Sequence, residues 1–350
     1  MDKLLKPCWS RTALAAVWSL LACGQQGIAA DRAPLERFEF TQVQMGMDFK
    51  LTFYAADETA ANRAAQAAYA RVAELNAVLS DYDPASELSR LSKSAGTDHS
   101  LPVGADLWHV LTVSQRLADA SDGAFDVTVG PFVRLWRRAR REREMPSAER
   151  LAEARSAVGH RLLKLDDESR TATLTQSGMR LDLGGIAAGY AADEALVILA
   201  RHGIQSALVD ASGDLVASDP PPGEPGWKIG IAPLAEAAVP SRFVWLANRA
   251  ISTSGDAFQY VEIDGVRYSH IVDPRTGLGL TRSRAVVVVA PDCVRADSLA
   301  TTLCVLGERS GIQFVESQPN VAAMFVDGQT DPPTVKLSAS FAKLAPQATD

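Results

Sequence analysis

The order of the predicted strands and helices constrains the fold of this chain most. Short apolar strands come in runs, many joined by hairpin-like turns such as Ile263-Asp264-Gly265, and only a few helices interrupt them. Regular alternation of strand and helix would indicate a parallel sheet instead, so the order favours an α+β fold. With 350 residues, of which 47% are hydrophobic, the chain can bury a large core, and we assign residues 36–330 to a single domain.

Hydrophobic periodicity places the individual elements. Residues 36–54 alternate apolar and polar side chains, which predicts two strands around a turn at Met45-Gly46-Met47. Residues 57–79 carry Ala, Val and Leu at helical spacing, and Pro84 prevents this helix from continuing. Further helices are predicted at 105–121, 147–158 and 186–201, and strands at 163–165, 179–183, 207–209, 227–232, 243–246, 260–263, 285–289 and 321–326. A loop rich in Ser and Glu is expected after Pro84, and a weakly ordered tail at 331–350.

Residues 1–30 have the features of a signal peptide. Three basic residues precede the apolar run Ala13–Cys23, which is too short to span a bilayer. Small residues at 27–30 offer one cleavage site, whereas Leu20 to Cys23 resemble a lipobox that would place a lipid on Cys23. Both alternatives predict an exported, periplasmic protein, and the second would anchor it to the inner membrane.

The charge distribution argues against a nucleic-acid partner. The chain has a net charge of −7, and export would remove such a partner. Six arginines gather near Trp136, at positions 134, 137, 138, 140, 141 and 143, but glutamates interrupt the run. A solvated helix face is our interpretation, with docking to an acidic acceptor protein as the alternative. Cys293 and Cys304, the two cysteines beyond the leader, are expected to be buried thiols.

Residues 181–193 form the first segment suited to chemistry. A predicted strand runs through Asp182 into Gly184-Gly185 and a helix. Glycines let the backbone approach a phosphate closely, and a helix N-terminus favours negative charge. A plain strand-to-helix connection is the alternative interpretation.

Two further segments carry polar side chains at informative spacing. His270 and Asp273 precede a proline turn at the end of a hairpin strand, although a histidine there can also be purely structural. Asp297 and Thr301 lie four residues apart at the start of an apolar helix, so both oxygens can face one point, as a hard cation such as Mg²⁺ requires. Asp297 could instead be the N-cap of that helix.

These segments, in this order, resemble the ApbE-type FAD:protein FMN transferase family. The segments at Met45-Gly46, 79–90, 123–131 and 252–256 match as well, so the resemblance runs from about Met45 to Gly307. It implies a T-fold-like arrangement of mixed and antiparallel sheets with flanking helices and an FAD cleft between two halves.

The resemblance also implies roles for particular residues. FAD would be held at Met45, Tyr82, Ala124, Phe125, Asp126, Asp182, Ala188 and Val272. Mg²⁺ would be bound by the Gly185 carbonyl and by the side chains of Asp297 and Thr301. His270 or Asp256 would accept the proton of the attacking hydroxyl. Ala188 stands where the family usually has Lys or Glu, so one polar contact to the nucleotide is absent.

The implied reaction is transfer of FMN from FAD to a Thr or Ser hydroxyl of an exported acceptor protein, with release of AMP. One alternative is an FAD pyrophosphatase, in which water replaces the acceptor hydroxyl. Another is a non-catalytic FAD-binding lipoprotein, but the presence of His270, Asp297 and Thr301 favours an active enzyme.

Overall fold

The computed structural model describes residues 34–231, 242–255, 259–329 and 332–344. The predicted leader (residues 1–30) and Asp256 therefore fall outside the described residues. The described residues from Leu35 onward form one compact unit. No helix among them is long and apolar enough to cross a bilayer.

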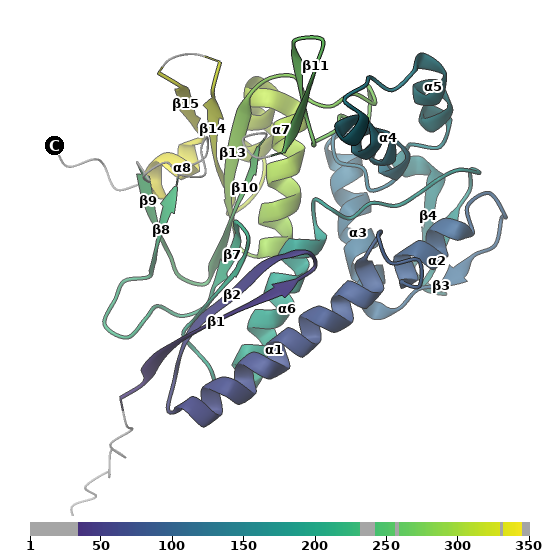
Figure 1. Ribbon diagram of the computed structural model, residues 1–350. Helices are drawn as coiled ribbons and strands as arrows, with labels where there is room; N and C mark the ends of the chain where they lie inside the picture. The colour runs from purple at the N-terminus through teal and green to yellow at the C-terminus, as the bar shows by residue number, and fades with distance from the viewer. Residues whose placement is uncertain (1–33, 232–241, 256–258, 330–331, 345–350) are drawn as a thin grey trace, which may run out of the picture. The chain divides into compact units, whose positions relative to one another are not determined.

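An eight-stranded antiparallel sheet organises this unit (Figure 1). Its strand order is β1-β2-β6-β7-β10-β13-β14-β15, and the bounds are Glu36–Gln44, Met47–Ala55, Ala207–Ala211, Asp214–Ala217, Arg249–Gly255, Arg284–Ala290, Ala322–Asp327 and Thr334–Leu337. The central strand β13 is a valine run buried on both faces, because alternate side chains enter two different apolar clusters. The α+β prediction is confirmed.

Three long helices cover one face of the sheet. They are α1 (Glu58–Leu79), α6 (Ala187–Arg201) and α7 (Cys293–Glu316), and α6 packs against both of the others. On the other face, the hairpin β8–β9 (Trp227–Ile231 and Arg242–Leu246) and helix α8 (Ala339–Leu344) close a second apolar cluster. Both faces are therefore shielded, and the loops at the ends of these elements are left to form a site.

The remaining elements form a smaller region beside α1 and α7 (Figure 1). The helices are α2 (Glu87–Lys93), α3 (Ala105–Ala120), α4 (Gly130–Glu142), α5 (Ala148–Ser156) and a short 3₁₀ turn at His160–Leu162. The strands are β3 (Leu101–Pro102), β4 (Leu163–Asp166), β5 (Thr171–Leu174) and the hairpin β11–β12 (Tyr260–Ile263 and Val266–Ser269). Helix α4 and this hairpin share a third apolar cluster that contains Trp136.

Four sequence predictions are wrong. Residues 179–183 form no strand, because only Arg180 pairs, in an isolated bridge to Val129. The expected loop after Pro84 contains α2, which Ser86 caps. The tail is ordered at 334–344, where β15 extends the sheet and Phe341 of α8 is fully buried. The helix that carries Asp297 and Thr301 begins at Cys293 with Asp292 as its N-cap, which rules out the alternative that Asp297 is the N-cap.

Candidate active site

The glycine turn after Asp182 lies directly against helix α7. A Cβ atom built on Gly185 would stand 2.9 Å from the Thr301 hydroxyl, and one on Gly189 would stand 2.4 Å from the Cys293 carbonyl oxygen. Only glycine permits such approach without displacing one of the two segments. The structure therefore brings Gly185, Asp297 and Thr301 together from positions more than 110 residues apart in the sequence.

The carboxylate of Asp297 is buried in an acidic environment. Its side chain is 4% exposed, and its Oδ2 accepts a hydrogen bond of 3.1 Å from the Gly189 amide. Burial raises the pKa of Asp297 well above its usual range, and the nearby carboxylates of Asp214 and Asp193 add to this effect. Among the residues that the structure describes, no Lys or Arg pairs with Asp297. A bound cation would relieve this concentration of negative charge.

The donors around this point suit a hard divalent cation. They are the carboxylate of Asp297, the hydroxyl of Thr301 and the backbone of Gly185. The Thr301 hydroxyl also lies 3.4 Å from the Ser254 hydroxyl. Oxygen ligands of this kind are the ones that Mg²⁺ prefers. The described residues contain no cluster of three or more His, Cys, Asp or Glu side chains suited to a metal, so a cation here would depend on the hydroxyl, the backbone and water.

Asp193 fixes the position of α7 against α6. Its carboxylate oxygens accept hydrogen bonds of 2.8 Å from the Cys293 and Val294 amides, which are the first two of helix α7. Two otherwise unpaired donors at the helix N-terminus are thereby satisfied. This contact holds the helix that carries Asp297 in register with the glycine turn.

A second polar cluster surrounds Arg137 of α4. The guanidinium donates to the carboxylates of Asp81 and Asp182, at 2.9 Å in the latter case, and lies 4.3 Å from the centre of the Tyr82 ring. The other Asp182 oxygen accepts from the Gly184 amide at 2.9 Å, which continues the network into the glycine turn. Tyr82 is 75% exposed, so its ring is available to a planar ligand.

Replacing Arg137 with methionine should lower the free energy of unfolding by about 2 kcal/mol, because two part-buried carboxylates would lose their shared cation. Burial and Asp81 raise the pKa of Asp182, and Arg137 opposes this. Without Arg137 the folded variant would hold more protons than the unfolded chain, so its stability should fall as pH rises. Urea unfolding at pH 5.5 and 8 measures this. Arg138→Met is the control, since Arg138 is exposed and pairs with the exposed Glu142. Equal losses in both variants would contradict the prediction.

The third cluster lies around His270, the residue that follows strand β12. The His270 Nδ1 atom lies 3.0 Å from the carbonyl oxygen of Gln259, a pure acceptor, which favours the neutral tautomer with its hydrogen on Nδ1 and its lone pair on Nε2. Val272 is buried, and the following turn is fixed to α4 by a 2.9 Å hydrogen bond from Trp136 Nε1 to the Gly277 carbonyl. Helix α4 thus connects this cluster with the one around Arg137.

The other predicted FAD contacts lie mostly in the protein interior. Met45 occupies the β1–β2 turn with a φ of 51° and packs against the main core. Ala124 and Phe125 are buried. The Asp126 carboxylate accepts two hydrogen bonds from Thr128, so its side chain stabilises its own loop. Ala188 is buried in the first turn of α6 and places no polar group there.

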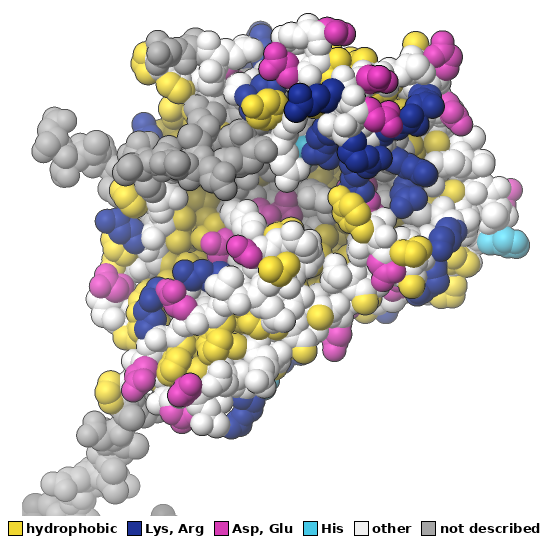
Figure 2. Space-filling view, viewed as in Figure 1, with side chains coloured by type: hydrophobic (Ala, Val, Ile, Leu, Met, Phe, Trp, Pro, Cys, Tyr) yellow, Lys and Arg dark blue, Asp and Glu magenta, His cyan; other side chains and the backbone are white. Residues whose placement is uncertain are grey.

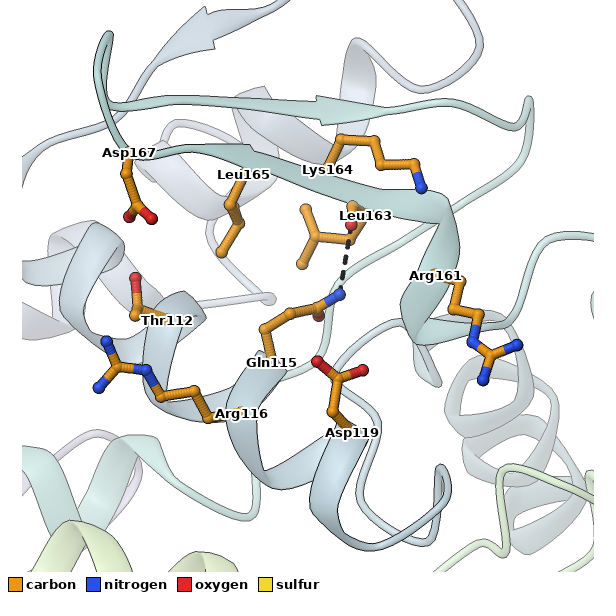
Figure 3. Close-up of a pocket in the computed structure, with 9 residues that line it drawn as sticks. All are labelled: Thr112, Gln115, Arg116, Asp119, Arg161, Leu163, Lys164, Leu165 and Asp167. Atoms are coloured by element: carbon orange, nitrogen blue, oxygen red, sulfur yellow. Dashed lines mark hydrogen bonds between the residues drawn. The ribbon is translucent and has the colours of Figure 1, made fainter.

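A separate cavity of about 450 Å³ lies between α3 and β4 (Figure 3). None of the predicted site residues lines it. The side chains of Arg116 and Arg161 extend in opposite directions (Figure 3), so these two arginines do not converge on one ligand position. The three clusters described above remain the candidate active site, since the 182–185 turn links the first to the second and α4 links the second to the third.

Comparison with known proteins assigns the family. The model of the ApbE family matches residues 45–325. The chain belongs to the ApbE family. The resemblance inferred from the sequence motifs is therefore confirmed.

Relatives in the ApbE family are similar over most of their length. The chain is 34% identical over 280 residues to the FAD:protein FMN transferase of Haemophilus influenzae, which covers 77% of this chain and 80% of that protein. It is 31% identical over 324 residues to the FAD:protein FMN transferase of Treponema pallidum, with 87% and 88% covered.

Solved ApbE structures have the same fold. The apo form of the Pseudomonas stutzeri flavinyl transferase ApbE superposes with a TM-score of 0.79 at 31% identity, covering 90% of this chain and 98% of that one. The flavin transferase ApbE from Vibrio cholerae gives 0.80 at 28% identity, with 89% and 100% covered.

Arg137 and Asp193 are absent from the residues predicted by sequence reasoning. The interpretation of the arginine run near Trp136 as a solvated helix face holds for one side of α4 only, because Trp136 is 2% exposed and Arg137 is half-buried. Helical spacing from the buried Phe132 and Trp136 could have separated the inward from the outward arginines. For Asp193 the sequence offers no comparable signal.

Proposed function

We propose that this chain transfers the FMN half of FAD to a Thr or Ser hydroxyl of an acceptor protein. In this reaction the acceptor oxygen bonds to the phosphorus nearer the riboflavin, the bond from that phosphorus to the bridging oxygen breaks, and AMP leaves. The observation that carries the proposal is the contact of Gly185 with Thr301 and of Gly189 with Asp297 in a member of the ApbE family.

Asp297, Thr301 and the Gly185 carbonyl would hold Mg²⁺ in this proposal. The ion, when bound, would neutralise charge on the pyrophosphate, an effect worth several kcal/mol in phosphoryl transfer. Tyr82, Asp182 and Val272 would orient the flavin nucleotide around the Arg137 cluster, and positioning of this kind is the other main source of rate in this chemistry.

His270 is our choice as the group that accepts the hydroxyl proton, and its Nε2 lone pair supports this. His270→Gln should slow FMN transfer by about 10²- to 10⁴-fold, because glutamine cannot take up a proton near neutral pH. FAD affinity should change little. The wild-type rate should rise as the imidazole loses its proton, and the variant should lack this rise. A pH–rate profile with the same shape in both proteins would argue for Asp256 or another group.

Mass spectrometry of an acceptor tests the proposed reaction. Incubation with FAD, MgCl₂ and a candidate exported acceptor should add one FMN phosphoester to the acceptor and release one AMP for each addition. Free FMN with an unmodified acceptor would indicate a pyrophosphatase, and intact FAD would indicate a binding protein. Asp292→Ala, which alters the N-cap of α7 and none of the proposed ligands, is a matched control for variants of Asp297.

We also propose that the enzyme acts outside the cytoplasm, on the basis of its leader sequence. Replacement of Cys23 by serine separates the two signal-peptide alternatives. Loss of membrane association with retained export would support a lipid on Cys23, whereas an unchanged distribution would support a plain signal peptide.

A further inference from the structure

Helix α4 presents two arginines, one turn apart, to the candidate site, and only one of them is neutralised. Arg137 is paired with Asp81 and Asp182. Arg140 makes one hydrogen bond, from Nη1 to the side-chain oxygen of Gln259 at 3.3 Å. Within the described part of the chain, no carboxylate lies within ion-pair distance of Arg140.

This arrangement leaves a half-buried positive charge with no counter-charge among the described residues. Burial lowers the pKa of Arg140, and the positive charge of Arg137 lowers it further. Keeping two cations this close costs free energy, which an anion bound between or beside them would offset. The outer arginines differ, since Arg138 is exposed and pairs with Glu142.

The position of Arg140 relates it to the substrate of the proposed reaction. Arg140 contacts Gln259, whose backbone carbonyl contacts His270, and it lies one helical turn from the Arg137 network of Tyr82 and Asp182. The buried Trp136 on the same helix is hydrogen-bonded to Gly277, so α4 is held in place. In Figure 2, Lys and Arg side chains gather in this region beside a recessed part of the surface. The charge at Arg140 therefore lies between the two clusters to which FAD binding is assigned.

We propose that Arg140 binds a phosphate group of the dinucleotide, whereas Arg137 serves to position Tyr82 and Asp182. This inference rests on the proposed function, in which FAD brings a pyrophosphate to the site. A guanidinium suits this task, because its planar donors match phosphate oxygens and remain charged at every physiological pH.

Calorimetric titration with ADP in MgCl₂ tests the proposal without requiring turnover. Arg140→Gln should weaken ADP binding by roughly 10- to 100-fold, as expected for loss of one charge-assisted contact. Its ADP affinity should also depend less steeply on NaCl concentration than that of the wild type. Arg140→Lys should retain only part of the affinity, because lysine keeps the positive charge but lacks the planar pair of donors of the guanidinium. Arg138→Gln removes the same charge from the outer face of α4 and should leave ADP binding unchanged.

Several outcomes would overturn the proposal. They are unchanged ADP affinity in Arg140→Gln, an equal loss in Arg138→Gln, an unchanged salt dependence, or absence of ADP binding by the wild-type protein. If unliganded Arg140→Gln has a lower melting temperature, and this loss of stability explains the weaker ADP binding, Arg140 has a structural role instead. Failure of the proposed function looks different: the wild type would bind ADP through Arg140 and yet transfer no FMN to any acceptor.

Discussion

Replacing Asp297 with alanine is expected to lower magnesium-dependent AMP release from FAD by about 10³-fold. The carboxylate is the one charged group among the proposed ligands, and its loss should abolish cation binding. Several kcal/mol of charge neutralisation would disappear with the cation, and each 1.36 kcal/mol corresponds to a tenfold change in rate. Chromatographic measurement of AMP in the presence of acceptor gives this rate.

Thermal unfolding separates metal binding from chemistry at this site. The melting temperature of the wild type should rise with MgCl₂ concentration, because the ligand binds the folded state alone, and that of Asp297→Asn should not. Without magnesium, Asp297→Asn should be at least as stable as the wild type, since it removes a buried negative charge near Asp214 and Asp193. Asp292→Ala should lose about 1 kcal/mol of stability, because it removes the N-cap of α7. It should keep magnesium-dependent AMP release and the rise of the melting temperature with MgCl₂. Unchanged AMP release in Asp297→Ala would remove the metal assignment.

Replacing Gly189 with alanine should lower the free energy of unfolding by about 3 kcal/mol, the upper part of the usual range for overpacking. The new methyl group would stand 2.4 Å from the Cys293 carbonyl oxygen and 2.9 Å from the Asp297 Cβ, and both belong to helix α7 rather than to a flexible side-chain end. The two helices must move apart, which would also displace Asp297 from the glycine turn.

Urea unfolding of Gly189→Ala measures the loss of stability, and AMP release measures the displacement. Ala200→Ser, an exposed position on the same helix α6, should change stability by less than about 0.5 kcal/mol. A Gly189→Ala protein as stable as this control would show that α6 and α7 are not in close contact.

Local signals explain why much of the fold could be predicted. Alternation over residues 36–54 and the turn at Met45-Gly46 specify the β1–β2 hairpin, and helical spacing with Asp57 as N-cap specifies α1. The predictions failed where tertiary context decides. Residues 179–183 alternate apolar and charged side chains but form a β-bridge only at Arg180, so the apolar residues Met179, Leu181 and Leu183 reflect burial in the core rather than membership of a sheet.

The parts of the candidate site that could be predicted are those whose residues lie close together in the sequence. The four-residue spacing of Asp297 and Thr301 puts both residues on the side of α7 that meets residues 185–189, where Thr301 lies against Gly185 and Asp297 against Gly189. Arg137 could not be assigned to the site from spacing, because its two partners lie 56 and 45 residues away. Contacts of that kind depend on how α4 packs. The hydrogen bond from Trp136 to the Gly277 carbonyl, which joins residues 141 positions apart in the sequence, helps to fix that packing.

Diffraction from crystals grown with MnCl₂ and FAD tests the central claim most directly, because manganese accepts the same oxygen ligands as magnesium and scatters anomalously. The account predicts one strong anomalous peak within bonding distance of the Asp297 carboxylate, the Thr301 hydroxyl and the Gly185 carbonyl, next to the pyrophosphate. Bound FAD with a manganese peak elsewhere, and none between the glycine turn and α7, would contradict it.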